Sequence, residues 1–424
     1  MIEILIIADD LSGAADCAIA CVSVGARTVV IIDPEADTDN ATAVSVDVNS
    51  RAMEPREAGA AIVAATEWLY EKGTRILYQK IDSTLRGHWA DDMVHIRQAA
   101  AKVLGRAPLA IVAPAFPEAG RATIDGHVFV NGTPLEDTEV WKQAGLTGPA
   151  DLRMLLTQAG LKVELASHEQ VALGSEALQT KLLNWLDAGC SAVVCDAQTE
   201  VDLLTVAAAT LALPEKPLWV GSAGLMRALV RAGEAKTTSL SPPTRDGVEK
   251  PVLVVVGSAS GASHMQFDAL AQAADVSCLV IPSSNLRLDT GPSQVRADIQ
   301  VLIDALACGS DAAVMIGNKE IDFSEGPQLA TALADLIAPY LSQVGGLVVT
   351  GGETARAILV KAGISGLRML GEIEPGVPVG LSIGEIAIPV ITKAGAFGDS
   401  TTLIRCHAAL RGGTSDHLIP ASGG

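Results

Sequence analysis

The chain has 424 residues, of which 49% are hydrophobic and 19% are charged, and its formal net charge at pH 7 is −19. This length exceeds what one hydrophobic core fills, and the composition is typical of folded soluble domains and not of disordered segments. Because the negative charge repels phosphate backbones and anionic membranes, we expect neither nucleic acid nor a membrane as a partner.

The seven cysteines are scattered and form no CxxC pair, which is typical of buried thiols in a reducing compartment. The sequence opens directly on a strand-like apolar run, and no apolar stretch approaches about 18 residues. We therefore predict a cytoplasmic protein.

Short runs rich in Val and Ile alternate with Ala-rich helical stretches, which predicts an α/β fold with mostly parallel sheets flanked by helices. In the first half, strands are expected at 4–8, 28–32, 43–46, 75–80, 109–113, 192–195 and 218–220. Helices are expected at 14–24, 55–71, 89–103, 174–187 and 201–212. Residues 121–138 break the rhythm with Gly, Asn and Pro, and we expect a hairpin or an excursion over the sheet edge there.

A polar stretch containing Pro242 and Pro243 interrupts the alternation and predicts a linker at 239–250. It separates an N-terminal α/β domain at 1–238 from a C-terminal α/β domain at 251–411. The second domain has expected strands at 252–256, 277–281, 312–316, 347–350, 379–381 and 386–389. Residues 412–424 lack periodicity and are expected to form a flexible tail.

Polar side chains follow several predicted strands of the first half, where open α/β sheets bind their ligands. Asp9 and Asp10 exceed what a helix cap needs, and paired acids can orient a hydroxyl, act as a base or hold Mg²⁺. The run from Lys80 to Arg86 combines cations, hydroxyls and an acid, a mixture that suits a polyhydroxylated anion. Arg51 is either a surface residue or a further guanidinium for the same pocket.

Small-residue turns follow three predicted strands of the second half, with the sequences VGSAS at 256–260, TGGET at 350–354 and KAGAFGD at 393–399. Turns without large side chains expose backbone N–H groups to an anion, and the helix that follows adds partial positive charge. Each turn alone is ordinary, but three of them in one domain predict a site for nucleotide phosphates.

Several signatures of other enzyme classes are missing from the sequence. It has no GxxxxGK[ST], no GxGxxG after a strand, no HExxH and no GxSxG. The histidines show no metal-ligand spacing. These absences disfavour a Walker-type NTPase, a dinucleotide-binding dehydrogenase, a zinc protease and an α/β-hydrolase.

Taken together, the motifs resemble those of the four-carbon acid sugar kinases over nearly the whole chain. They are IADDLSGAAD at 7–16, KIDSTLRG at 80–87, APAFPEAGR at 113–121, VGSAGL at 220–225, VVGSAS at 255–260, TGGETA at 350–355 and TKAGAFGD at 392–399. The resemblance implies an N-terminal sugar-acid-binding domain and a C-terminal nucleotide-binding domain, with the substrate site in the cleft between them. It also implies transfer of the ATP γ-phosphoryl group, with Mg²⁺, to the terminal hydroxyl of a four-carbon sugar acid.

The same resemblance implies individual site residues. Substrate contacts are expected from Asp9, Arg51, Asp82, Ser83, Thr84 and Leu85. From the chemistry of the residues themselves, we also expect Lys80 and Arg86 to join Arg51 in holding the substrate carboxylate. ATP contacts are expected from Ser258, Gly351, Gly352, Glu353, Thr354 and Gly395, with Gly398 in the same loop as Gly395. The leading candidates for the base are Asp9 and Asp10, and Asp82 is next. Asp399 is an alternative, because AGAFGD also resembles the anion-hole turn of ribokinase-type sugar kinases, and the metal ligands stay unassigned.

The first motif indicates the substrate. ADDLSGAAD is similar to the motif of members that act on D-threonate and D-erythronate, whereas ADDFTGATD is typical of members that act on 3-oxo-tetronate. We therefore expect D-threonate first, D-erythronate next and 3-oxo-tetronate as the alternative. A non-catalytic sugar-acid-binding protein is the alternative from another class, and a homodimer is an open expectation.

Overall fold

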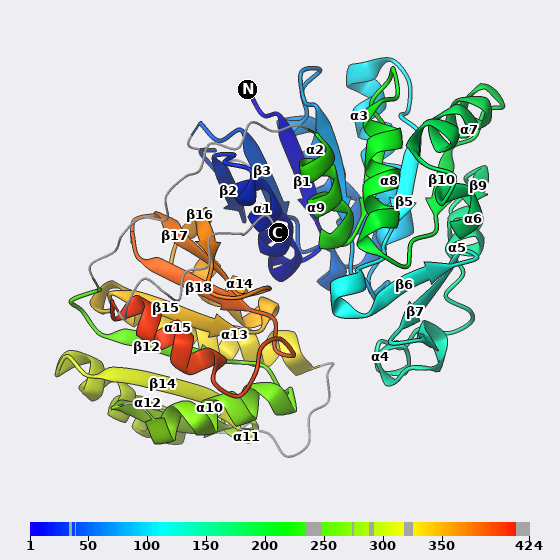
Figure 1. Ribbon diagram of the computed structural model, residues 1–424. Coiled ribbons are helices and arrows are strands. Elements are labelled where there is room, and N and C mark those ends of the chain that lie inside the picture. The colour runs from blue at the N-terminus through cyan, green and yellow to red at the C-terminus, as the bar shows by residue number, and fades with distance from the viewer. Residues whose placement is uncertain are drawn as a thin grey trace. The chain divides into compact units, whose positions relative to one another are not determined.

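The computed structural model describes residues 1–33, 36–38, 40–233, 247–273, 275–287, 292–317 and 325–412. They divide into two compact units (Figure 1): the first holds Met1–Thr28 and the described residues from 33 to 233, and the second holds Val29–Ile32 and those from 247 onward. Residues 239–246 of the expected linker and 413–424 of the expected tail lie outside the described residues. The boundaries of the two domains therefore stay a prediction.

The sheet of the first unit is parallel and runs in the order β3-β1-β4-β11-β5-β10-β9. In that order, its strands are Ala43–Asp47, Ile4–Ala8, Ile76–Lys80, Leu218–Gly221, Ala110–Ala113, Ala192–Cys195 and Val163–Ala166. Strands covered on both faces read as continuous apolar runs, which is why the sequence predicts most of them. The sequence did not predict β9, because this edge strand is only half-buried and includes Glu164.

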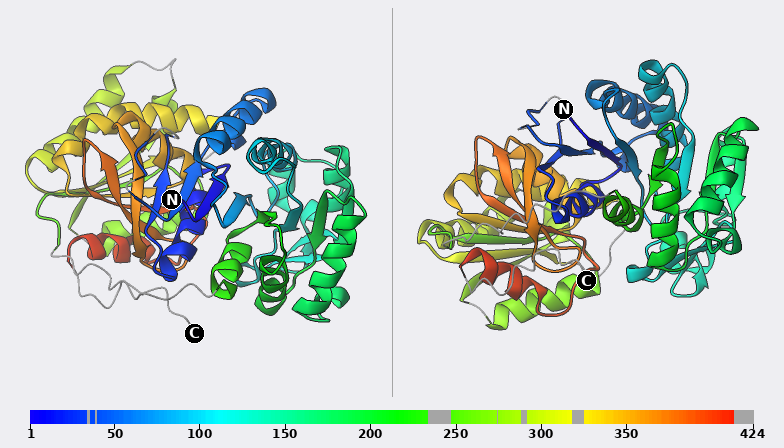
Figure 2. Two further views of the ribbon diagram at one scale, coloured as in Figure 1. Left: turned by 90° about the horizontal axis from the view of Figure 1, so that it is seen from above. Right: turned by 45° about the horizontal axis from the view of Figure 1, so that its top comes forward.

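Helices cover both faces of this sheet, as Figure 2 shows. One face carries α1 (Leu11–Ser23), α7 (Ser175–Asp187), α8 (Glu200–Leu211) and α9 (Ala223–Ala232), and the other carries α2 (Pro55–Leu69) and α3 (Trp89–Leu104). Shorter helices are η1 (Ser50–Ala52), η2 (Pro117–Ala119), η3 (Leu135–Asp137), α4 (Glu139–Gln143), α5 (Leu152–Gln158) and α6 (His168–Val171). The core between the sheet and the α1 face includes the fully buried Trp219 and Tyr78.

The predicted hairpin at 121–138 is confirmed as a small antiparallel sheet of β6 (Arg121–Ile124), β7 (His127–Val130) and β8 (Thr133–Pro134). Its turns contain Asp125 and Asn131 at positive φ, each followed by a glycine at positive φ. Asn and Asp tolerate this left-handed region, and Gly adopts it freely, so the turn residues account for the hairpin.

The sheet of the second unit runs in the order β13-β14-β12-β15-β18-β17-β16-β2. Its strands are Val276–Pro282, Asp311–Gly317, Val252–Val256, Gly346–Thr350, Pro389–Lys393, Pro378–Gly384, Ile364–Glu372 and Thr28–Ile31. The pairs from β13 to β18 are parallel, whereas β17 and β16 are antiparallel to their neighbours. The sequence predicts a strand here but does not predict that β2 joins the sheet of the second unit. An apolar run fits any buried strand and does not indicate which strand it pairs with.

The last strand of this sheet corrects the sequence analysis. A strand was expected at 386–389, but β18 begins at Pro389, and 386–388 are not in a strand. Pro cannot donate to the ladder, and it is tolerated at the first residue of a strand, so Pro389 marks the start of β18 and not the end of a strand. The long β16 was also missed, because its glycines and Arg368 interrupt the apolar pattern.

Helices cover both faces of the second sheet as well (Figure 2). α10 (Gly261–Ala273) and α15 (Thr402–Leu410) pack on one face, and α13 (Gly326–Ile337) and α14 (Gly352–Lys361) lie on the other. The remaining helices are α11 (Ser283–Leu286), α12 (Pro292–Ala307) and η5 (Ala338–Gln343). Throughout the described parts of both units, every helix is too short or too polar to cross a membrane.

Candidate active site

The turns that follow β1, β3 and β4 meet at one edge of the first unit. Ala8 at the end of β1 is in register with Asp47 at the end of β3 and with Lys80 at the end of β4. Because all three strands are parallel, the residues directly after them share the carboxyl edge of the sheet. This topology brings the predicted acids at 9–10 and 82 together with Arg51 and Lys80.

Arg51 holds both adjacent acids of the first motif. Its Nε donates to Asp9 Oδ2 at 2.9 Å and its Nη2 donates to Asp9 Oδ1 at 2.8 Å, so the guanidinium binds this carboxylate with two bonds. Its Nη1 donates to Asp10 Oδ2 at 3.0 Å. Asp10 also caps α1 by accepting a hydrogen bond from the Gly13 N–H at 2.9 Å. The alternative that Arg51 is an isolated surface residue is therefore wrong.

The two acids have different environments. Asp9 is 5% exposed, and burial raises its pKa to about 6, although the charge of Arg51 opposes this shift. The pKa of Asp10 is lowered, because Arg51, Lys80 and the Gly13 N–H together outweigh burial. Two neighbouring carboxylates thus differ in their pKa values, which is the arrangement that separates a base from a permanently charged partner.

The KIDSTLRG turn contributes a third acid. Arg86 Nε donates to Asp82 Oδ2 at 2.6 Å, and Thr84 Oγ1 also donates to this carboxylate. These contacts lower the pKa of Asp82 despite its burial. Leu85 has a φ of 58°, a strained value for a bulky residue, and its backbone N–H donates to Asp82 O at 2.9 Å. The turn is therefore closely defined, and its acid is permanently ionised.

The first motif and the KIDSTLRG turn lie against each other at Gly87. A Cβ at this position would lie 3.3 Å from Asp9 Oδ2 and from Arg51 Cγ, and its φ is 86°. Gly thus fits a place where the backbone must turn tightly beside the Arg51 and Asp9 pair. Ser83 is half-buried on the same turn.

Lys80 is a buried cation of this edge without a direct partner in the described residues. It is 7% exposed, and its Nζ lies beside Gly13, where a Cβ would be 2.5 Å from Nζ and 2.6 Å from Asp10 Oδ1. The negative charges of Asp10 and Asp9 raise its pKa above the usual value, against the effect of burial. Lys80 therefore stays charged and is available to an anionic ligand.

Arg121, at the start of β6, is the last residue of the motif APAFPEAGR and was not among the expected site residues. Burial lowers its pKa, while Asp82 and Arg86 are near enough to act on its charge. Its Nη1 donates to Ala119 O, and its buried Nε has no partner among the described residues. A cation with a free donor next to Asp82 belongs in the candidate substrate set, and the signal for it was the Arg that ends APAFPEAGR.

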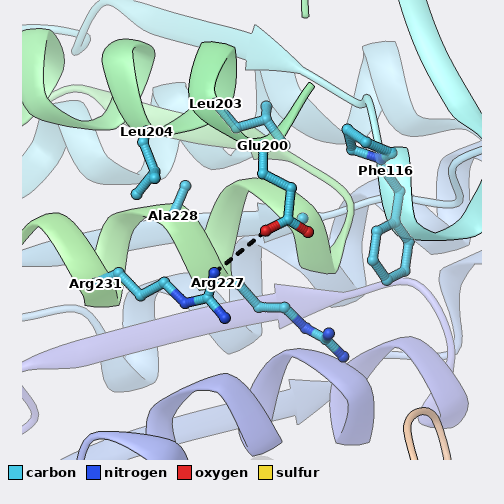
Figure 3. Close-up of a pocket in the computed structure, with 9 residues that line it drawn as sticks. Phe116, Glu200, Leu203, Leu204, Arg227, Ala228 and Arg231 are labelled. Atoms are coloured by element: carbon cyan, nitrogen blue, oxygen red, sulfur yellow. Dashed lines mark hydrogen bonds and ion pairs between the residues drawn. The ribbon is translucent and has the colours of Figure 1, made fainter. Parts of the chain in front are cut away.

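A shallow hollow lies between α8 and α9 (Figure 3). Its charged groups are paired: Arg231 Nη1 lies 3.3 Å from Glu200 Oε2, and Arg227 pairs with Glu118 at 2.6 Å. The rest of the lining is Phe116, Pro117, Leu203, Leu204, Gly224 and Ala228. None of the predicted site residues lines this hollow.

The glycine-rich turns of the second unit follow β12, β15 and β18. Val256 is in register with Thr350, and Thr350 with Lys393, so these turns share the carboxyl edge of adjacent parallel strands. Gly257 N–H donates to Thr350 O at 3.0 Å, and Gly351 N–H donates to Lys393 O at 2.8 Å. The structure thus brings together the turns that the sequence analysis treated separately.

Two of these glycines leave no room for a side chain. A Cβ at Gly257 would overlap Thr354 Oγ1, and a Cβ at Gly395 would overlap Ser258 Oγ. Gly351 has a φ of 98°, which favours glycine, and it caps α14, whose first turn carries Gly352 and the exposed Glu353. The sequence-predicted residues Ser258, Gly351, Thr354 and Gly395 therefore form one close-packed cluster.

Asp399, the alternative base, lies at the start of α15 on the same edge. It accepts hydrogen bonds from Thr401 N–H at 2.8 Å and Thr401 Oγ1 at 2.7 Å, and its side chain is 65% exposed. The Thr401 bonds, and then Arg405, lower its pKa to about 2. Gly398 has a φ of 82°, and a Cβ there would overlap Thr402 Oγ1. The carboxylate thus binds Thr401, the residue that directly precedes α15.

The donor sets of the two edges fit different ligands. In the part of the chain that the structure describes, no three His, Cys, Asp or Glu side chains are grouped to hold a metal ion. The acids of the first unit are engaged by arginines, whereas the second unit offers backbone N–H groups, which suit phosphate. Mg²⁺ commonly binds through substrate phosphates with few protein ligands, so these residues fit a metal that is carried by a nucleotide.

Comparisons with known proteins agree with this division. A family model described as "Sugar-binding N-terminal domain" matches residues 4–229, and one described as "Nucleotide-binding C-terminal domain" matches residues 253–403. The chain is 45% identical to a D-threonate kinase of Cupriavidus necator, over 94% of this chain and 96% of the relative. It is 30% identical to a 3-oxo-tetronate kinase of Pseudomonas fluorescens, over 96% of this chain and 97% of the relative.

The fold is similar to that of a solved structure as well. A crystal structure of a Haemophilus influenzae protein aligns with a TM-score of 0.76 and 22% identity, over 96% of this chain and 100% of that chain. This likeness confirms the two-domain α/β fold. The matches of both halves and the 45% identity confirm the resemblance read from the motifs: the chain belongs to the family of four-carbon acid sugar kinases.

Proposed function

We propose that this protein is an ATP-dependent kinase that phosphorylates the terminal hydroxyl of D-threonate. The observation that supports D-threonate as the substrate is the 45% identity to a D-threonate kinase, which extends over both units. D-Erythronate is the next candidate, and 3-oxo-tetronate, on which a relative at 30% identity acts, is the alternative. A cytoplasmic location and a homodimer complete the proposal.

Asp9 is the proposed base. A hydroxyl that attacks a phosphoryl group needs a proton acceptor, and such an acceptor works best with a pKa near the operating pH. The pKa of Asp9, raised to about 6, meets this condition better than those of Asp10 and Asp82, which are lowered. Arg51 uses two bonds to fix the Asp9 carboxylate, which keeps free lone pairs to accept a further proton.

The remaining charged groups of the first unit are proposed to bind the sugar acid. Asp82 can accept hydrogen bonds from substrate hydroxyls, as can the hydroxyls of Ser83 and Thr84. Lys80 and Arg121 have no carboxylate partner in the described residues, so they complement the substrate carboxylate better than Arg51 and Arg86, which already face protein acids. This assignment changes the order of the expected carboxylate holders without removing any of them.

The second unit is proposed to bind ATP through the turns after β12, β15 and β18. Their glycines allow close approach of phosphate to the backbone, and the start of α14 adds partial positive charge. Bound ATP supplies the γ-phosphoryl group, and Mg²⁺ offsets its charge. The protein's part is to hold and orient the phosphates, for which Ser258, Gly351, Gly352, Thr354 and Gly395 are the proposed contacts.

A coupled assay of ADP release tests the function directly. The full-length protein is incubated with ATP and Mg²⁺ and with D-threonate, D-erythronate, L-threonate or 3-oxo-tetronate in turn. We expect the highest kcat/KM for D-threonate. Turnover of 3-oxo-tetronate alone would favour that substrate, and turnover of none of the acids, with tight binding of one, would favour a non-catalytic binding protein.

A further inference from the structure

Lys393, the last residue of β18, is a buried cation that the sequence analysis did not assign to the site. It is 2% exposed, and its Nζ donates to the carbonyl oxygens of Ala394 at 3.0 Å, Gly395 at 3.3 Å and Phe397 at 3.0 Å. Within the described residues it forms no ion pair with a carboxylate. Its ammonium therefore acts on the backbone of the loop that follows it.

Side chains from α10 and from Ser260, which directly precedes it, donate hydrogen bonds to two of the same carbonyl groups. Ser260 Oγ donates to Gly395 O at 2.6 Å, and Ser263 Oγ donates to the same oxygen at 2.9 Å. Gln266 Nε2 donates to Phe397 O at 3.0 Å. Together with Lys393, these donors satisfy the loop carbonyls on the side that faces the protein interior.

The backbone geometry then fixes where the loop N–H groups point. In a trans peptide the C=O and the following N–H point in opposite directions, and no described peptide bond is cis. The N–H groups of Gly395, Ala396 and Gly398 each follow a carbonyl bound by Lys393, so they point away from it. None of these three N–H groups donates to a protein acceptor in the described chain. Adjacent free N–H groups on one side of a loop form a nest for an anion.

The surroundings of Lys393 leave its charge uncompensated. The titratable neighbours that act on it are Cys406, on α15, and Glu374, in the turn after β16. Burial raises the pKa of Cys406 to about 12, so this thiol is neutral. Glu374 accepts hydrogen bonds from Arg405 Nε at 2.7 Å and Thr402 Oγ1 at 2.6 Å, so its charge is already paired. A buried ammonium without its own counter-ion favours an anion on the far side of the loop.

We propose that Lys393 is a positioning residue that holds loop 394–398 open as an anion nest for a phosphate group of the nucleotide. The identity of the ligand rests on the proposed function, whereas the nest itself rests on the contacts above. Lys393 acts through the loop carbonyls and reaches the anion only electrostatically. Losing its charge would release the carbonyls, turn the peptides and remove the nest.

The first test measures ligand binding by calorimetry and needs no turnover. Lys393→Met keeps the length of the side chain and removes its charge and its donors. We expect the Kd for ADP to rise about tenfold or more, which is the change expected when a binding site loses one contact. The Kd for D-threonate should stay unchanged. Lys361→Met, at an exposed lysine of α14, is the matched control and should change neither value.

Two results of this test lead elsewhere. An unchanged Kd for ADP in a folded Lys393→Met protein would overturn the role of Lys393. Failure of the kinase assay with every acid, together with weaker ADP binding in Lys393→Met, would instead keep the nest and overturn the proposed substrate.

A pH series on the wild-type protein provides the second test and stands even if Lys393→Met does not fold. Burial lowers the pKa of Lys393 to about 8, so its charge is lost as the pH rises through that value. We expect ADP affinity to fall about tenfold per pH unit above about pH 8, where the phosphates of ADP stay fully ionised.

Folding stability should follow the opposite course over the same pH range. A lysine whose pKa is lower in the folded than in the unfolded state destabilises the fold while it is charged, and this cost is relieved between about pH 8 and about pH 10.5. If Lys393 had only a structural role, ADP affinity would not fall over a pH range in which folding stability is maintained. A flat ADP affinity from about pH 7 to about pH 9.5 would contradict the proposal.

Discussion

The two strand edges that carry the candidate site residues use different chemistry, although both lie at the carboxyl ends of parallel strands. On the first unit, side chains form the surface: Arg51 joins Asp9 to Asp10, and Arg86 binds Asp82. On the second unit, the backbone forms the surface, and the buried Lys393 donates hydrogen bonds to the carbonyl groups of the loop.

This difference predicts how each edge responds to substitution. A side-chain site loses function when a charge or a donor is removed, whereas a backbone site loses function when an atom is added or when a peptide turns. The first unit should therefore be sensitive to isosteric changes that keep the volume. The second should be sensitive to a single methyl group.

The largest effect is expected for Asp9→Asn, which keeps the shape of the side chain and removes its basicity. We expect kcat to fall about 10²–10⁴-fold, with little change in the KM for ATP, as for other general bases. Asp10→Asn is the matched control, because Asn also caps helices and Asp10 is not the proposed base. Steady-state kinetics of both variants measure the difference, and normal turnover of Asp9→Asn would move the base to another acid, with Asp399 as the first to test.

The next effect concerns stability at the opposite end of the second sheet, where neither ligand is expected. Asp311, the first residue of β14, accepts hydrogen bonds from Arg411 Nε at 2.9 Å, Val252 N–H at 2.7 Å and His407 Nε2 at 2.6 Å. Asp311→Asn leaves the Arg411 charge without its partner, so we expect a loss of about 3 kcal/mol in the free energy of unfolding.

Both KM values of Asp311→Asn should stay at the wild-type level in conditions where the variant is folded. A chemical denaturation series gives the free energy, and steady-state kinetics give the two constants. A selective rise in the KM for ATP would place this cluster in the nucleotide site and contradict a role in stability alone.

Gly395→Ala adds one methyl group to the backbone edge. Its Cβ would overlap Ser258 Oγ, so either the turn or the serine must shift. We expect the KM for ATP to rise about tenfold or more, with the KM for the acid unchanged. Gly261→Ala is the matched control, because no atom lies within 4 Å of a Cβ at Gly261. Equal effects of the two substitutions would rule out close contact at the turn after β18.

The pH profile of the wild-type enzyme distinguishes a base from a permanently charged group. Because the pKa of Asp9 is raised to about 6, its carboxylate accepts a proton from solvent as the pH falls through that value. We expect kcat to fall about tenfold per pH unit below about pH 6 and to level off above about pH 7. The profile of Asp9→Asn should lack this limb, and a limb that persists in this variant would assign it to another group.

The smallest effect is expected for Arg86→Gln. This guanidinium is 45% exposed, and exposed ion pairs contribute little because water screens them. We expect the KM for the acid to rise about two- to fivefold, with the KM for ATP unchanged. A loss of more than about a hundredfold would show that Arg86 holds the substrate carboxylate directly, as the motif suggested.

The side-chain edge could be predicted largely from the sequence, because charged residues after apolar strands are conspicuous. Asp9, Asp10, Arg51 and Asp82 were all singled out in this way, and the structure brings them together. Their pairing could not be predicted, because it depends on the register of β1 with β3 and β4. The same limit explains why Arg51 and Arg86 were both expected to be free for substrate.

The backbone edge was predicted less completely. Its glycines are visible in the sequence, but each is ordinary at a turn after a strand, and only the register of β12, β15 and β18 brings them together. Lys393 was missed, because a lysine at the end of an apolar strand is usually exposed and its burial follows from the cover of α10 and α15. The pairing of β2 with β16, which places Val29–Ile32 in the second unit, was also missed. Strands that are distant in the chain leave no local sequence pattern of their pairing.

The central claim is that the first unit binds the sugar acid and the second binds the nucleotide, each through its own chemistry. Calorimetric binding of D-threonate and of ADP to Lys80→Met and to Gly395→Ala tests it most directly. We predict a crossed result: Lys80→Met loses affinity for D-threonate alone, and Gly395→Ala loses affinity for ADP alone. Loss of both ligands in either folded variant, or the reverse pairing, would contradict the account.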